Sequence, residues 1–218
     1  MRKFDSFLSE LASIEVPERA CNQWSRTIGD LRGNTIRRRN LRLYLSELDA
    51  IGPRMLLIGE AVSHRGGRLS GIAFVSESVM LAGVETRSGR VLGADQGYRK
   101  ATPGLRLSTE ASATMVWETI RNITPLPMLW NAFPFHPFHA GVPDTNRAPT
   151  REELAIGERF IARVLRLFAF ERVVAIGNHA SASLARMNVA HDKVRHPSQG
   201  GKNLFVDGMA RLSQLRRA

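Results

Sequence analysis

The sequence predicts an α/β protein, a three-layer α/β/α sandwich with a central, mostly parallel four-stranded sheet. Short apolar runs alternate with amphipathic stretches, an order typical of a parallel sheet covered by helices on both faces. The strands are expected at Met55–Ile58, Met128–Asn131, Arg172–Ile176 and Lys193–His196. A chain of 218 residues, with no internal repeat or low-complexity tract, fits a single domain over residues 1–218.

The helices are predicted from apolar spacing, caps and breakers. Residues 1–50 are expected to be a helical N-terminal part of the same domain, broken near Pro17. Thr150 followed by Glu153 is a capping box that starts a long helix. Residues 76–108 have mixed polarity and are expected to form a loop with short irregular elements. The expected helices span residues 4–13, 16–28, 37–48, 111–121, 151–168, 180–187 and 205–215.

The charge balance points to a polyanionic partner. Lys and Arg number 31 against 20 Asp and Glu, a net charge of +11, and most of the excess is Arg. Arg forks onto phosphate oxygens and stacks on bases, and no strongly basic amphipathic helix favours a membrane surface instead. A basic, solvated surface without a nucleic-acid partner explains the charge equally well. Charge alone leaves both interpretations open.

The single cysteine, Cys21, excludes an internal disulfide, a cysteine-based zinc site and a cysteine-ligated iron–sulfur cluster. We expect it to be a reduced thiol in a partly buried helix. No stretch reaches the ~20 apolar residues that cross a bilayer, and no apolar signal-peptide core follows the N-terminus. His136 and His139 suggest a metal site but lack a third ligand. A monomeric cytoplasmic protein without a metal or cofactor is therefore expected.

Three polar segments follow predicted strands. They are Gly59–Gly67, Asn131–Pro137 and Arg195–Lys202. In an open parallel sheet, the loops at the carboxyl ends of the strands converge on one crevice, where ligands bind. A carboxylate, an amide and an imidazole from distant parts of the chain are therefore expected to meet.

Each of these groups also has a plain structural explanation. Glu60 alone is typical of a surface acid, Asn131 of a turn residue, and His196 of a structural histidine. At a cavity mouth, however, an amide can bind both a carbonyl and an imide N–H. Their predicted convergence, and not any one of them, indicates a site.

In this order the segments resemble the uracil-DNA glycosylase superfamily, over about Met55 to Phe205. The resemblance implies that Gly59-Glu60-Ala61 positions the attacking water, that Phe74 stacks on the base, and that Asn131 reads it. It implies that His196-Pro197-Ser198 stabilises the leaving base and enters the DNA. The implied site has Glu60 and His196 as catalytic residues; Gly59, Ala61, Ser63, Phe74 and Asn131 as base-binding residues; and His64, Arg65, Ser70, Ser198, Gln199, Gly200 and Lys202 as DNA-binding residues.

Two differences from the motifs of this superfamily imply that the chain resembles a divergent member of it. The Glu of Gly-Glu-Ala is similar to that of the iron–sulfur branch, but the four cluster cysteines are missing. The best-known uracil-specific branch has an Asp one place after the Glu60 position, followed by a Tyr, where this chain has Ala61 and Ser63. A base pocket wider than a strictly uracil-specific one is therefore expected.

The expected function is base excision repair. The protein would flip uracil, and other deaminated or damaged bases, out of single- or double-stranded DNA and hydrolyse the N-glycosidic bond. An alternative is a non-catalytic or covalently trapping uracil-DNA binder. That branch carries an added Arg-rich loop ending in His, which residues 75–100 lack. A nucleotide-binding or nucleoside-hydrolysing enzyme is a third possibility, but it would need no basic surface.

Overall fold

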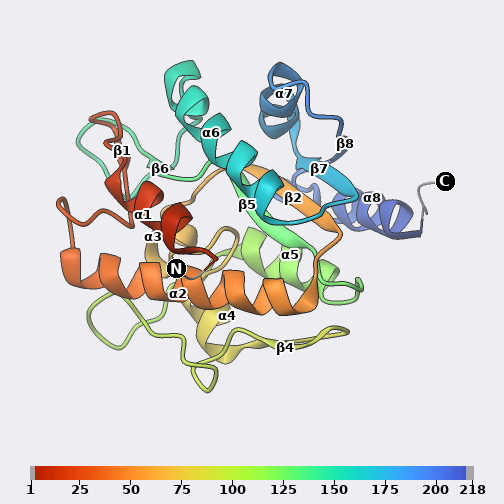
Figure 1. Ribbon diagram of the computed structural model, residues 1–218, viewed down its shortest axis with the longest axis horizontal. Helices are drawn as coiled ribbons and strands as arrows, with labels where there is room; N and C mark the ends of the chain where they lie inside the picture. Colours follow the sequence, from red (N-terminus) through yellow and green to blue (C-terminus); the bar gives the residue numbers. More distant parts are fainter. Residues whose placement is uncertain (1–2, 215–218) are drawn as a thin grey trace.

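The computed structural model describes residues 3–214 and contains a sheet of four parallel strands in the order β5-β2-β7-β8, flanked by helices (Figure 1). These strands are β2 (Met55–Ala61), β5 (Met128–Phe133), β7 (Arg172–Ile176) and β8 (Asp192–Val194). The predicted fold class is confirmed, and the described sheet is wholly parallel.

Three of the four strands of the sheet, β5, β2 and β7, are buried along almost their whole length. All residues of β5 and β7 are buried, as is typical of parallel strands covered on both faces. In β2 only the last two residues, Glu60 and Ala61, are half-buried. The register pairs Gly59 with Asn131 and Ala61 with Phe133. Glu60 and Asn131 therefore emerge at the same edge of the sheet.

The helices lie on both sides of the sheet. They are α1 (Asp5–Ser13), α2 (Leu31–Ile51), α3 (Gly67–Ser70), α4 (Glu77–Ala82), α5 (Ala111–Ile120), α6 (Arg151–Leu167), α7 (Asn178–Arg186) and α8 (Lys202–Gln214). The structure has helices near six of the seven predicted ranges, and α3 and α4 were not predicted. The capping box of α6 is present, because Thr150 Oγ1 accepts from the Glu153 N–H and Glu153 Oε2 accepts from the Thr150 N–H. Within residues 3–214, no helix combines the length and apolar character needed to cross a membrane.

The helix predicted over residues 16–28 is wrong. This segment contains turns and the two-residue strand β1 (Ala20–Cys21), which pairs antiparallel with β6 (His136–Pro137). The side-chain amide of Asn22 donates to the carbonyls of Leu11 at 2.8 Å and Ile14 at 2.9 Å. Such side-chain bonds compete with helical backbone bonds, and Pro17 adds a break. Cys21 is therefore a half-buried strand residue and not a helical one.

Other boundaries differ from the predicted ones because of local caps. Helix α2 begins at Leu31 instead of Arg37, since the Asp30 side chain accepts from the Gly33 N–H. Residues 76–108 are more regular than predicted: they include α4, capped by Ser76, and a hairpin of β3 (Val84–Thr86) and β4 (Gly89–Val91). Helix α8 begins three residues early, and the predicted end at residue 215 lies outside the described residues.

Candidate functional site

A cavity of about 230 Å³ lies at the carboxyl ends of the sheet strands. It contains residues from all three predicted polar segments, including Glu60, Asn131 and His196. The β2–β5 pairing and the loop after β8 bring these residues together although they are far apart in the sequence. The full lining is Glu60, Ala61, Val62, Ser63, Phe74, Glu110, Ser112, Asn131, Asn146, Arg147, His196 and Ser198.

Glu60 presents a carboxylate oxygen that no hydrogen bond uses. Its Oε1 is buried and accepts from no residue that the structure describes. His179 Nδ1 lies 3.8 Å from this oxygen, an ion pair only when that ring is protonated. Burial raises the pKa of Glu60, and His179 partly offsets the effect. The carboxylate is therefore well suited to hold a water molecule.

Asn131 presents a second unpartnered oxygen. The residue is 3% exposed, and its Oδ1 accepts from no group within residues 3–214. A Cβ on the neighbouring Gly59 would stand 2.7 Å from this oxygen and 2.3 Å from Cζ of Phe74. Only glycine allows the Asn131 amide and the Phe74 ring to approach the β2 backbone so closely.

Phe74 forms an aromatic wall of the cavity. Its backbone is in the left-handed region, with φ of 55°, which is unusual for a bulky residue and is typical of functional positions. The Trp117 indole N–H donates to the Phe74 carbonyl at 3.0 Å and so holds this conformation. The centroids of the Phe74 and His196 rings lie 6.5 Å apart. A planar group entering the cavity would meet both rings.

His196 is held as a neutral hydrogen-bond donor. The Ser198 N–H donates to its Nδ1 at 3.2 Å, and Ser198 Oγ lies 2.7 Å from the same nitrogen. An Nδ1 that accepts leaves the proton of a neutral ring on Nε2. Burial, and then the charge of Arg195, lower the pKa of His196. The tight loop requires Gly201, where a Cβ would stand 2.1 Å from the His196 carbonyl oxygen.

Sequence reasoning missed Glu110 and Ser112. Glu110 directly precedes the helix predicted over residues 111–121 and was given no role in the site, yet it lines the cavity. Its Oε1 accepts from Ser112 Oγ at 2.9 Å, and its Oε2 is buried without a partner among the described residues. Helical spacing predicts where α5 begins, but it does not indicate that the residue before α5 faces the end of β2.

Asn146 and Arg147 were missed as well, and they tie the loop before α6 to the cavity rim. Asn146 Oδ1 accepts from the His64 N–H at 2.9 Å. Arg147 makes two bonds to Glu153, at 2.6 and 2.7 Å, and the side chain of Glu153 is 1% exposed. The capping box in the sequence identifies Glu153 as a helix-capping residue, but it does not indicate that Glu153 also binds Arg147.

The predicted DNA-binding residues lie in different environments. Four of them, Arg65, Gln199, Gly200 and Lys202, are exposed, and His64 and Ser198 are half-buried. The ammonium of Lys202 lies 3.2 Å from a carboxylate oxygen of Glu118. Ser70 is fully buried, and its hydroxyl donates to the Val75 carbonyl at 2.6 Å. It cannot reach a phosphate, so the predicted DNA contact of Ser70 is wrong.

His136 has a structural position. Its ring is buried, with Nδ1 2.8 Å from the Val62 carbonyl and Nε2 3.0 Å from the Pro143 carbonyl. Burial lowers its pKa, although the two carbonyls oppose this effect. Across residues 3–214, no group of three or more His, Cys, Asp or Glu side chains is placed to hold a metal ion.

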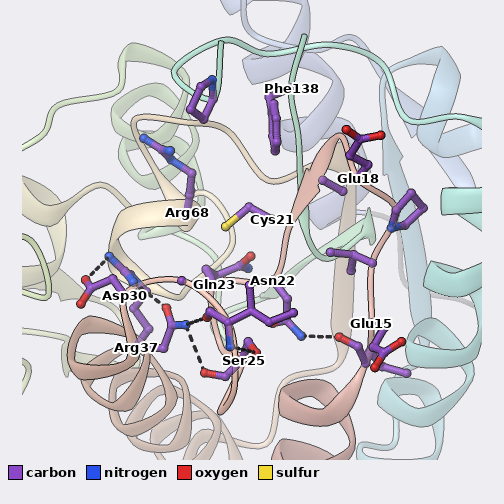
Figure 2. A pocket seen from close by; sticks show the side chains of 18 of the residues that line it. Glu15, Glu18, Cys21, Asn22, Gln23, Ser25, Asp30, Arg37, Arg68 and Phe138 are labelled. Atoms are coloured by element: carbon purple, nitrogen blue, oxygen red, sulfur yellow. Dashed lines mark hydrogen bonds and ion pairs between the residues drawn. The ribbon is translucent and has the colours of Figure 1, made fainter. Parts of the chain in front are cut away.

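A second and larger cavity, of about 800 Å³, lies between strand β1, the first turns of helix α2 and the short helix α3 (Figure 2). Cys21, Arg68 and Phe138 surround its centre. Burial raises the pKa of the Cys21 thiol, although Arg68 and Arg37 oppose the effect, so the thiol is a poor nucleophile. No residue of the sequence-predicted site lines this cavity.

No protein-family model matches the chain, and no curated protein is significantly similar to it. The functional assignment therefore depends on the cavity at the carboxyl ends of the strands.

Proposed function

We propose that the protein is a DNA repair glycosylase that flips uracil, and other deaminated or damaged bases, out of DNA and hydrolyses the N-glycosidic bond to leave an abasic site. The observation that carries this proposal is the convergence of Glu60, Asn131 and His196 on one cavity beside the ring of Phe74. An acceptor for water, an acceptor for an imide N–H and a neutral donor are the groups that this reaction needs.

The chemical step follows from these groups. Glu60 orients a water molecule, whose oxygen bonds to C1′ of the sugar as the C1′–N1 bond breaks. The bonding electron pair leaves with the base, and the water proton passes to Glu60 and then to solvent. Negative charge on the departing base gathers on O2, where the Nε2–H of His196 donates. Preorganised charges and donors of this kind supply much of the catalysis in enzymes.

Base recognition would use the other two groups. The Asn131 oxygen has no partner among the described residues, so it can accept from N3–H of uracil. Its amide N–H can donate to O4. The Phe74 ring supplies a stacking surface for a base that has left the duplex. The reading of the base therefore needs no movement of the sheet.

DNA binding would come from the basic surface around the cavity. The net charge is +11, and Arg65, Gln199, Gly200 and Lys202 are exposed on the loops that border the site. Contacts of this kind with phosphates give affinity without sequence preference. Because one chain supplies every group that lines the cavity, we propose that the enzyme acts as a monomer.

Two other functions are less well supported. A uracil-DNA binder without turnover would not need a carboxylate with a free oxygen at the cavity, as Glu60 has. A nucleoside hydrolase would not need a net charge of +11.

One assay distinguishes the three functions. Oligonucleotides bearing uracil, hypoxanthine, xanthine or ethenocytosine are incubated with the protein, and abasic sites are detected by alkaline cleavage on a gel. We expect cleavage at uracil and at one or more of the other bases, in chelator as well as without it. Binding without base release would support the non-catalytic alternative. Release of bases from free nucleosides, but not from DNA, would support the third function.

A further inference from the structure

We propose that the larger cavity, beside β1, is a second binding site and takes a small organic anion with an apolar, ring-sized body. The two cavities share no lining residue, and the inference does not rest on the glycosylase function. The volume of about 800 Å³ lies within the range of small-molecule sites, about 300–1,000 Å³.

The apolar walls of the cavity are held in place by hydrogen bonds. The carbonyl of Phe138 accepts from Arg147 Nε at 2.9 Å, and its ring stacks on His136 with the centroids 6.0 Å apart. On the segment before β1, the Asn22 amide donates to the Ile14 carbonyl at 2.9 Å. The cavity is therefore formed before a ligand binds. Its apolar lining residues are Ile14, Val16, Pro17, Ala20, Ile28, Leu69, Phe138 and Pro143.

Two guanidinium groups give the interior of the cavity a positive charge. The side chain of Arg37 is 8% exposed, whereas that of its partner Asp30 is 51% exposed. The same contrast holds for Arg68, at 19%, and its partner Asp144, at 77%. Solvent therefore screens the carboxylates more than the cations. Both guanidiniums lie close enough to the Cys21 thiol to lower its pKa, against the larger effect of burial.

The other carboxylates of the lining do not cancel this charge. Glu15 and Glu18 line the cavity but are exposed to solvent. Figure 2 shows them across the Cys21 thiol from the two guanidiniums. An anion that enters on the arginine side therefore meets cations at close range and carboxylates only through hydrated space.

Arg68 is the cation that would bind the anion directly. Arg37 is already used, because it donates to Asn34 Oδ1 at 2.8 Å and to the Leu69 carbonyl at 3.1 Å. Arg68 instead pairs with an exposed carboxylate at the surface, which the oxygens of a ligand can replace. A guanidinium binds a carboxylate, sulfonate or phosphate through two parallel hydrogen bonds. Figure 2 shows the Phe138 ring at the same end of the cavity, where it would contact the apolar body.

The test uses two probes with the same ring system: 1-anilinonaphthalene-8-sulfonate, which carries an anion, and N-phenyl-1-naphthylamine, which lacks it. Cys21 is the single cysteine of the chain and lines this cavity, so its alkylation by iodoacetamide reports whether the cavity is occupied. The reaction is run at alkaline pH, because burial raises the pKa of the thiol, and the adduct is measured by mass spectrometry.

We expect the sulfonate to protect Cys21. At about ten times the Kd obtained from its fluorescence, the sulfonate should slow alkylation about tenfold, since few cavities are then empty. The neutral probe should need a concentration at least about tenfold higher for the same protection, because it makes no hydrogen bond to a charged group.

Arg68→Met should weaken protection by the sulfonate at least about tenfold, because it removes the charge and keeps the length of the side chain. The matched control is Arg166→Met, an exposed cation of α6 outside the cavity lining, which should leave protection unchanged. Asp144→Asn removes the carboxylate that competes for Arg68 and should tighten binding about two- to fivefold. A gain of affinity does not come from misfolding, so this variant serves if Arg68→Met does not fold.

Three results would overturn the inference. If both probes protect Cys21 equally, the cavity has no preference for an anion. If neither probe slows alkylation, even where the fluorescence of the sulfonate shows binding, the ligand site is not this cavity. If Arg68→Met and Arg166→Met behave alike, Arg68 does not bind the anion. All three results leave the glycosylase function untouched, because that function is measured by base release from DNA.

Discussion

The backbone N–H of Ser198 donates to Nδ1 of His196, which fixes the proton of the neutral ring on Nε2. The loop after β8 therefore presents one hydrogen-bond donor of fixed position, the Nε2–H of His196. It also separates the contribution of the backbone of Ser198 from that of its hydroxyl, because substitution by alanine removes the hydroxyl and keeps the backbone N–H.

His196→Ala should slow uracil release by about 10²–10³-fold, the usual effect of removing a donor to a developing negative charge. Ser198→Ala should have a smaller effect, since its N–H still orients the ring. Single-turnover rates on a uracil oligonucleotide measure both. Equal losses in the two variants would mean that the hydroxyl, and not the backbone, controls the ring.

Glu60→Gln should reduce turnover by about 10²–10⁴-fold, because the amide cannot accept the water proton. Binding to uracil DNA should be nearly unchanged, since Glu60 is proposed to act on water and not on phosphate. Fluorescence anisotropy and gel cleavage separate the two quantities. Near-normal excision by this variant would move the role to another residue, with Ser63 and His64 as the next candidates.

The pH dependence follows from two opposite shifts. Glu60 must be ionised to accept a proton, and burial raises its pKa, so activity should fall as the pH falls through a value above the ordinary one of about 4.3. Burial lowers the pKa of His196, so the ring stays neutral to a lower pH than an ordinary histidine. The rate profile should therefore show an acid limb that is absent from the residual activity of Glu60→Gln. An identical limb in that variant would contradict the assignment.

Lys202→Ala should weaken DNA binding and make log K less dependent on salt. The slope should become shallower by about 0.9 for each phosphate that the ammonium neutralises in the complex. The control is Arg166→Ala, an exposed cation in the last turn of α6, away from the cavity. Binding constants at several salt concentrations provide the slopes. An unchanged slope for Lys202→Ala would show that this side chain does not contact the DNA backbone.

Glu153→Ala should destabilise the fold by about 3–5 kcal/mol, because it leaves the Arg147 charge without its buried partner. Glu152→Ala, which removes the exposed neighbouring carboxylate, is the control and should change stability little. Urea denaturation at pH 7 measures both. Comparable losses in the two variants would mean that the Arg147–Glu153 pair contributes little.

The stability from this pair should also depend on pH. Burial opposes ionisation of Glu153, but the hydrogen bonds from Arg147 and Thr150 prevail and lower its pKa below the usual value. The stabilisation is therefore complete above the unfolded-state pKa and is lost as the pH falls through the lower folded-state value. The difference between the unmodified protein and Glu153→Ala should shrink accordingly in acid.

The sheet and the main groups of the site were predictable because their signals are local. Each strand is a short apolar run, and a parallel sheet brings the residues after its strands to one edge. Thr150 and Glu153 are three residues apart and define the start of α6 by themselves.

The features that were missed depend on contacts between distant segments. Asn22 bonds to the carbonyls of Leu11 and Ile14, and this arrangement replaces the helix expected over residues 16–28. Glu110 lines the cavity, and its carboxylate packs against Gly66 of another loop, where a side chain would leave it no room. Neither spacing nor composition encodes such proximity, and Ser70 shows the converse, since a polar residue in a promising loop can be fully buried.

The pairing of Gly59 with Asn131 limits how this site can vary among related sequences. Side chains alternate between the two faces of a strand, so a shift of β2 by one residue would turn Glu60 to the opposite face. The backbone hydrogen bonds of β2 and β5 thus set the spacing between Glu60, which we propose holds water, and Asn131, which we propose reads the base. The surrounding loops can lengthen or change composition without moving these two residues. Such changes would alter the range of bases that the proposed pocket accepts. Insertions or deletions within these two strands would separate Glu60 from Asn131, and with them the two proposed roles.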